Sequence, residues 1–200
     1  MLCISFPAPF PPVSAVTPLV AEQFAWELCF HPQQPQVDFV LDGICHGFKL
    51  GFSPSQKLKS AKKNKPSAIQ HASVIDAYLA NEVSLGRVAG PFNSPPPHRT
   101  FPNLQISSFG VIPKKGQPGK WCLIVDLSSP LGASVNDGIS ADEFTLHYIT
   151  VDQIIRSVSR LGKGALMAKF DVKSTYRNVL VHPSDRHLLG MKCVTSTMLI

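Results

Sequence analysis

The chain has 200 residues, a formal net charge of +6, and a composition that is 44% hydrophobic and 16% charged. This length suits one domain of ordinary size or one domain with a tail, and the hydrophobic fraction excludes a fully disordered chain. The basic balance favours a polyanionic partner, and nucleic acid before a membrane.

The cysteine pattern and the first residues bear on where the protein resides. The cysteines stand far apart and form no CxxC pair, so neither a zinc site nor a disulfide framework is indicated. Prolines interrupt the first apolar residues, no basic stretch precedes them, and no apolar run reaches the roughly 18 residues of a membrane span. We therefore expect an intracellular protein of the cytoplasm or nucleus, with no signal peptide, no transmembrane segment and no membrane partner.

Residues 1–35 contain seven prolines and neither lysine nor arginine. Proline-rich segments favour an extended, solvated backbone, so we expect this segment to be mostly disordered. Phe24, Trp26, Leu28 and Phe30 form a candidate docking patch within it.

Residues 36–48 have helical spacing of apolar side chains, and a basic run follows them. This run has two interpretations, a solvated loop or an arm that contacts phosphates, and the loop is the commoner outcome for such charge runs. Its lysines are Lys49, Lys57, Lys59, Lys62, Lys63 and Lys65.

The pattern over 67–86 predicts a helix that Ser67 caps and Gly86 ends. A proline-rich linker is expected over 90–102. The chain thus divides into a disordered segment (1–35), a part with a helix, a basic loop and a linker (36–102), and a domain over 103–200.

The third part has the strongest local signals. Residues 104–115 and 120–129 alternate and are rich in β-branched side chains around the turn sequence GQPG, which predicts a β-hairpin. A helix capped by Thr150 is expected over 151–161, and an apolar strand over 165–172 that carries Asp171 at its end. The order of these elements indicates an α+β fold.

Asp171 is the main candidate for chemistry, because ligands and metals often bind at strand ends in α/β architectures. Carboxylate oxygens suit Mg²⁺. From the pattern alone, Asp171 could equally be a strand-end cap or an ion-pair partner.

Two longer strings resemble a known family. FDVKSTYRNVLVHPSDR resembles the first palm motif of reverse transcriptases, and VIPKKGQPGKWCLIVDLSSPLGASVNDGI resembles their fingers hairpin. The similarity is greatest to reverse transcriptases of gypsy-type and DIRS-type retrotransposons, and it runs from about residue 86 to residue 191. It implies a partial right-hand polymerase, with fingers and the start of the palm.

The resemblance also implies roles for the palm residues. Asp171, with the Val172 carbonyl, would hold two Mg²⁺ ions that promote attack of a primer 3′-OH on a deoxynucleoside triphosphate. Backbone amides near Ser174 and Thr175 would face the triphosphate. Tyr176 would lie under the sugar and exclude a 2′-OH.

In the fingers, the resemblance places Lys115 over the γ-phosphate. Cys122 stands where the family has an arginine that braces the triphosphate, so we expect weaker nucleotide binding. We interpret Trp121 and Asp126 as structural residues. Charge alone nominates further lysines for phosphate contacts, without base readout, and these include Lys114, Lys120, Lys62 and Lys63.

A polymerase palm needs a second acidic motif, usually Tyr-x-Asp-Asp, and these 200 residues contain none. We therefore expect a truncated reverse transcriptase domain, an RNA-directed DNA polymerase by ancestry that is inactive alone and whose partners are an RNA or DNA primer–template. The ending CVTSTMLI reads as a frameshift, a splice error or decay. The alternatives are a non-catalytic nucleic-acid-binding module and a decayed product without a role.

Overall fold

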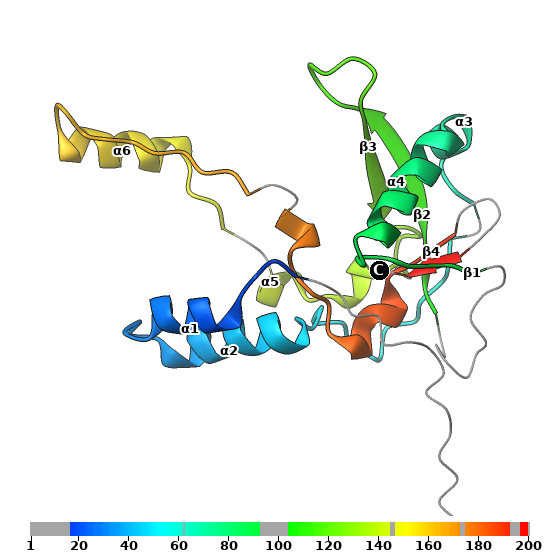
Figure 1. Ribbon diagram of the computed structural model, residues 1–200, viewed down its shortest axis with the longest axis horizontal. Coiled ribbons are helices and arrows are strands. Elements are labelled where there is room, and N and C mark those ends of the chain that lie inside the picture. Colours follow the sequence, from blue (N-terminus) through cyan, green and yellow to red (C-terminus); the bar gives the residue numbers. More distant parts are fainter. Residues whose placement is uncertain are drawn as a thin grey trace, which may run out of the picture.

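The computed structural model of the chain describes residues 17–61, 63–92, 104–144, 147–172, 175–192 and 197–199. The expectation of mixed helices and strands is confirmed. Five strands form one sheet in the order β1-β5-β4-β2-β3. Some helices pack beside this sheet and others project from it (Figure 1). The strands are β1 (Ala89–Phe92), β2 (Ile106–Pro113), β3 (Trp121–Asp126), β4 (Gly190–Lys192) and β5 (Thr197–Leu199).

The predicted hairpin is present as β2 and β3. The two strands pair antiparallel from Ser108 opposite Asp126 to Pro113 opposite Trp121. Gly116 and Gly119 have φ angles of +70° and +77° in the connecting turn, a conformation that side chains with a Cβ rarely adopt. The hairpin was predictable because both its alternating pattern and its turn chemistry are local.

The rest of the sheet is non-local. β2 pairs in parallel with β4 (Ile106 opposite Gly190), β4 pairs antiparallel with β5, and β5 pairs antiparallel with β1. Strand β1 occupies the start of the segment expected to be a linker, while the rest of that linker, residues 93–102, lies outside the described residues.

Two helices replace the single helix expected over 67–86. They are α3 (Pro66–Gln70) and α4 (Ala72–Ser84), and His71 breaks them apart with φ −121° and ψ 39°. Ser67 does not cap α3, because its hydroxyl accepts a hydrogen bond from the Val111 N–H of β2 at 3.2 Å. The main core joins these helices to the sheet and consists of Ala68, Ile75, Leu79, Val88, Phe109, Val111 and Met191.

Helices α1 (Ala21–Leu28) and α2 (Gln34–His46) lie side by side, away from the sheet (Figure 1). The expectation of disorder over 1–35 is therefore wrong for α1, whereas α2 confirms the helical spacing over 36–48; residues 1–16 lie outside the described residues. Val37 and Ile44 are buried on α2. Pro35 stands in the first turn of α2, where its missing N–H costs no helical hydrogen bond.

Helix α6 (Val151–Leu161) has the predicted bounds and cap. The Thr150 hydroxyl accepts from the Gln153 N–H at 3.3 Å, and the Gln153 side chain accepts from the Thr150 N–H at 2.7 Å. This reciprocal capping box satisfies two of the free amides at the start of the helix. α6 nevertheless projects from the body and buries none of its residues (Figure 1).

The strand expected over 165–172 is not formed. These residues form neither helix nor strand and run back along α6 (Figure 1). Leu166 is 97% exposed and Phe170 is 90% exposed. An apolar segment forms a β-strand only when a neighbouring strand satisfies its backbone hydrogen bonds. None of the described strands lies beside residues 165–172.

Short elements complete the fold. They are α5 (Ala141–Phe144) and three 3₁₀ turns at Asn136–Gly138, Thr175–Arg177 and Pro183–Leu188. Within the described ranges, no helix is long and apolar enough to cross a membrane.

Candidate nucleic-acid interface

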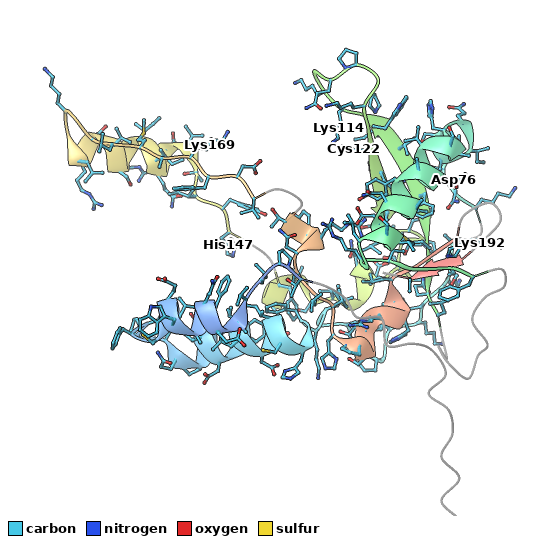
Figure 2. All side chains as sticks on the ribbon, in the orientation of Figure 1. Asp76, Lys114, Cys122, His147, Lys169 and Lys192 are labelled. Carbon is cyan, nitrogen blue, oxygen red and sulfur yellow. The ribbon has the colours of Figure 1, made fainter. Side chains whose placement is uncertain are left out.

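The tip of the β2–β3 hairpin carries three exposed lysines, Lys114, Lys115 and Lys120. The Lys114 N–H donates to the Lys120 carbonyl at 2.8 Å, so these two residues face each other at the base of the turn. The tip stands clear of the body, where Figure 2 labels Lys114. The sequence has no acidic residue between Glu82 and Asp126, so no carboxylate within this stretch offsets the positive charge.

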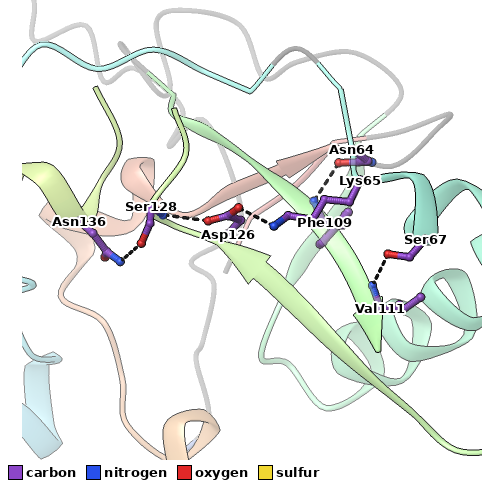
Figure 3. Close-up of polar contacts among 8 residues, drawn as sticks. All are labelled: Asn64, Lys65, Ser67, Phe109, Val111, Asp126, Ser128 and Asn136. Carbon is purple, nitrogen blue, oxygen red and sulfur yellow. Dashed lines mark hydrogen bonds and ion pairs between the residues drawn. The ribbon is translucent and has the colours of Figure 1, made fainter. Parts of the chain in front are cut away.

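The basic run before α3 lies against β2. The Ala61 N–H donates to the Ile106 carbonyl at 2.7 Å, and the Lys65 N–H donates to the Phe109 carbonyl at 2.8 Å. The Asn64 side chain accepts from the Phe109 N–H at 3.0 Å (Figure 3). The run is thus neither helix nor strand, as expected of a loop, but its backbone is fixed to the sheet.

An ion pair ties this run to the hairpin. Lys65 Nζ lies 2.7 Å from Asp126 Oδ2, and the other oxygen of Asp126 accepts from the Ser128 N–H at 3.1 Å (Figure 3). The hydrogen bond from Lys65 is the main cause that lowers the pKa of Asp126 below its ordinary value, with the Ser128 amide contributing further. Both contacts agree with the interpretation of Asp126 as a residue that braces the loop.

Two other hairpin residues were singled out from the sequence. The Trp121 ring stacks on His71 with centroids 3.9 Å apart and packs against the core, which agrees with a structural role. Cys122, which the resemblance places where reverse transcriptases have an arginine, pairs with Ile112 and is half-buried. It offers no charge to a phosphate.

The structure does not gather the predicted palm residues into a pocket. Asp171 and Val172 are exposed in the segment beside α6, and the Tyr176 side chain is 90% exposed. The Thr175 hydroxyl donates to the Val172 carbonyl at 2.6 Å, so this oxygen already has a partner within the chain. Ser174 lies outside the described residues.

The hairpin lysines and the segment that carries Asp171 stand apart. Figure 2 shows Lys114 at the hairpin tip and Lys169, close to Asp171 in the chain, on the opposite arm beside α6. Among the remaining nominated lysines, Lys63 is exposed, and Lys62 lies outside the described residues. The arrangement therefore offers a basic tip without an adjoining carboxylate site.

A two-metal centre requires several oxygen ligands held in fixed positions. Among the described residues, no group of three or more His, Cys, Asp or Glu side chains could hold a metal ion. A single exposed carboxylate does not supply the charge or geometry for two Mg²⁺ ions, so magnesium at Asp171 stays a prediction from the resemblance.

One buried polar cluster was not anticipated. Glu82 of α4 is 4% exposed, and its Oε2 lies 3.7 Å from both Arg87 and Arg177. Arg177 also donates to the Tyr78 hydroxyl at 3.2 Å. The cluster fixes the 3₁₀ turn after Asp171 onto α4, and only the three-dimensional fold places its members together, because Arg177 is far from α4 in sequence.

Neither a scan of known protein families nor a search of curated proteins finds a match to this chain. The resemblance to reverse transcriptases therefore rests on the chain's own motifs.

Proposed function

We propose that the chain is a nucleic-acid-binding module of reverse-transcriptase type, in which the fingers-like hairpin holds the backbone of a primer–template. By this proposal its ancestry is that of a retrotransposon RNA-directed DNA polymerase, and the described residues bind without catalysing nucleotidyl transfer. The observation that carries the proposal is the exposed lysine tip on a hairpin that the Lys65–Asp126 pair holds to the basic run.

The lysine tip suits phosphate contacts better than base recognition. Ammonium groups on flexible stems act as point charges that neutralise phosphates and release counterions. Such contacts fix position on the nucleic acid but carry no sequence information. The expected binding is therefore weak, sensitive to salt and independent of sequence.

The test is titration of a labelled primer–template with the 200-residue chain over a series of salt concentrations. The paired variant Lys114→Gln/Lys120→Gln removes two charges that face each other across the turn. We expect this variant to bind more weakly and to reduce the slope of log K against log salt by about 1.5–2, since each duplex phosphate contact contributes about 0.9.

The matched control is Lys163→Gln/Lys169→Gln, which removes two exposed charges near α6. The control is expected to retain the wild-type slope. Equal losses in the two variants would assign the binding to net charge rather than to the hairpin, and affinity that is unchanged by salt would refute phosphate contact altogether.

A further inference from the structure

A cavity of about 480 Å³ lies between three segments that are far apart in sequence. Its walls come from alternate residues of 52–60, from residues 104 and 105 just before β2, and from the 3₁₀ turn Pro183–Leu188. Its volume falls within the roughly 300–1,000 Å³ of sites that hold small molecules. Among the described residues, neither the lysines of the hairpin tip nor the residues nominated around Asp171 line it.

Hydrogen bonds of the backbone hold these walls in place. The Gln105 N–H donates to the His187 carbonyl at 2.8 Å, and the Ser53 N–H donates to the Gly138 carbonyl at 2.8 Å. The Phe52 ring rests on Gly138, where a Cβ would overlap it. The cavity is therefore formed without a ligand, which lowers the entropic cost of binding one.

The amide side chains of the wall use their donors within the protein. Gln105 Nε2 donates to the Lys59 carbonyl at 2.8 Å, and Gln56 Nε2 donates to the Gly132 carbonyl at 3.0 Å. Gln105 is only 3% exposed, and its Oε1 accepts no hydrogen bond from a described residue. The one side-chain atom of the described residues that lacks both a hydrogen bond and solvent is Glu82 Oε2, so Gln105 Oε1 is reached from the cavity.

The 3₁₀ turn adds further acceptors to the wall. His187 Nδ1 lies 2.7 Å from the Ser184 carbonyl, an oxygen that only accepts, so Nδ1 carries the hydrogen and Nε2 of the neutral ring is an acceptor. The Asp185 carboxylate accepts from the Leu50 N–H at 2.7 Å and from the Ser184 hydroxyl at 2.9 Å, which leaves a lone pair on each oxygen. Within the described part of the chain, no cation pairs with Asp185.

A cavity whose free polar atoms are acceptors selects a ligand that is rich in N–H donors. Among the standard nucleobases, guanine alone has two adjacent donors on its pairing edge, the N1–H and the N2 amino group, and these match the two oxygens of a carboxylate. The apolar part of the wall suits the faces of such a base, because aromatic and aliphatic side chains stack on flat rings. It consists of Phe52, Leu58, Leu104 and Leu188.

We propose that this cavity binds the base of a free guanine nucleoside. The Asp185 carboxylate accepts from N1–H and from the N2 amino group, and Gln105 Oε1 and His187 Nε2 accept from the remaining N–H and from the ribose hydroxyls. The pairing edge of a base within a duplex is already occupied. The site therefore adds no sequence preference to the duplex contacts of the lysine tip.

A guanidinium group also presents two parallel donors to a carboxylate, but the cavity suits a nucleoside better. A volume of about 480 Å³ and a wall with an aromatic ring accommodate a bicyclic base with its sugar, whereas one guanidinium on a thin stem leaves most of this space empty. The net charge of +6 on the chain also disfavours a cationic ligand.

The experiment measures binding of nucleosides to the 200-residue chain by equilibrium dialysis, in the absence of nucleic acid. Guanosine is expected to bind with a dissociation constant on the order of 10–100 μM, as is usual for a ligand of its size. Inosine lacks the N2 amino group and is expected to bind about tenfold more weakly, because a hydrogen bond to a charged group is lost. Adenosine has one amino donor beside an acceptor, and a loss of at least about tenfold is expected for it too.

The variant Asp185→Asn removes the charge and keeps the shape of the side chain. Its amide oxygen can still accept from the Leu50 N–H, but its NH₂ group donates where the carboxylate accepted, so guanosine is expected to bind at least about tenfold more weakly. Xanthosine has a carbonyl oxygen in place of the N2 amino group, and the variant is expected to prefer it to guanosine. Misfolding cannot exchange one preference for another. The matched control is Asp152→Asn on α6, which is expected to bind both nucleosides like wild type.

The lysine tip provides a control that separates this site from the proposed function. The variant Lys114→Gln/Lys120→Gln is expected to bind guanosine like wild type although it binds primer–template more weakly. Loss of guanosine binding in this variant would place the nucleoside at the hairpin and overturn the assignment to the cavity.

Four further outcomes would overturn the proposal. Guanosine that does not bind at about 1 mM has no site of the expected affinity. Equal affinity for guanosine, inosine and adenosine shows stacking without recognition of the pairing edge. Undiminished guanosine binding by Asp185→Asn excludes the carboxylate. Binding of agmatine, a small guanidinium compound, in place of guanosine assigns the cavity to a cation.

Discussion

Gly110 allows a long side chain to cross the face of β2. A Cβ at this position would lie 3.1 Å from Cδ of Lys65, which is closer than most contacts of a Cβ atom. Lys65 passes over this gap to reach Asp126 on the neighbouring strand. Glycine in the middle of this strand thus leaves room for the Lys65 side chain, although glycine inside a strand otherwise weakens pairing.

At pH 7, replacing Lys65 with Met is expected to lower the free energy of unfolding by about 0.2–1 kcal/mol, the range of partly exposed pairs. The pKa of Asp126 is lower in the folded state than its ordinary value of 3.8. The stabilisation is therefore present above the unfolded pKa and is lost as pH falls through the folded pKa.

Urea unfolding at neutral pH and in acid measures this difference, with Lys63→Met as the exposed control. A deficit at pH 7 that shrinks in acid supports the pair, whereas a deficit that grows in acid contradicts it.

Glu82 is expected to matter more for stability than any exposed acid. Its replacement by Ala leaves Arg87 and Arg177 without their carboxylate, and breaking a fully buried pair costs about 3–5 kcal/mol. Both arginine side chains keep some contact with solvent, at 26% and 20% exposure, so a smaller loss of about 1–3 kcal/mol is expected. Denaturant unfolding tests this against Glu143→Ala on α5, and equal stability of the two variants would contradict it.

At the scale of elements, the local stability of α6 is expected to be independent of the stability of the whole protein. Loss of an N-cap hydroxyl typically costs about 0.5–2 kcal/mol. Because α6 buries no residue, Thr150→Ala is expected to make local unfolding of α6 more frequent. The free energy of global unfolding of the monomer is expected to stay the same.

Hydrogen exchange resolves the two effects. Amides of α6 should lose protection in Thr150→Ala but not in Ser159→Ala, and amides of β2 should keep theirs. A fall in the protection of β2 would show that α6 is coupled to the core.

The elements that sequence predicts are those with local causes. The hairpin around Gly116 and Gly119 and the helix capped by Thr150 are specified within their own segments. The apolar run before Asp171 has the same composition as a buried strand, but no partner strand covers it, and composition cannot supply a partner. Prolines suggested disorder before residue 36, whereas the packing of α1 on α2 outweighs them.

Some residues of the candidate site could likewise be predicted from local sequence, and others could not. The local turn sequence predicted that Lys114, Lys115 and Lys120 lie at the tip of a hairpin, and they are exposed there. The Lys65–Asp126 pair and the Glu82 cluster depend on which distant segments meet, so no local pattern could identify them. The assignment of Asp171 to metal binding rests on the resemblance alone and stays a prediction.

At the scale of the whole molecule, the 200-residue chain is not expected to extend a primer with deoxynucleotides and Mg²⁺ or Mn²⁺. Asp171 is exposed, and the hairpin lysines stand on a different part of the molecule (Figure 2). Catalysis that works by positioning is sensitive to such separation, since a displacement of about 1 Å can cost about 100-fold in rate.

Primer extension with purified protein checks this, with Asp171→Ala alongside wild type. Both should show only background. Extension by wild type that Asp171→Ala abolishes would show that further carboxylates come together around Asp171 during the reaction.

The strand order has a consequence for synthesis of the protein. β2 and β3 are neighbours in sequence and can pair early, but the parallel neighbour of β2 is β4, near residue 190. Closing so long a loop is slow, and a chain made from its N-terminus reaches β4 long after β2 and β3. Until then Ile106 and Ser107 of β2 lack their partners in β4, and Phe109 lacks Met191 in the core. The nascent chain is therefore expected to be most open to aggregation through this part of β2 until β4 has emerged from the ribosome.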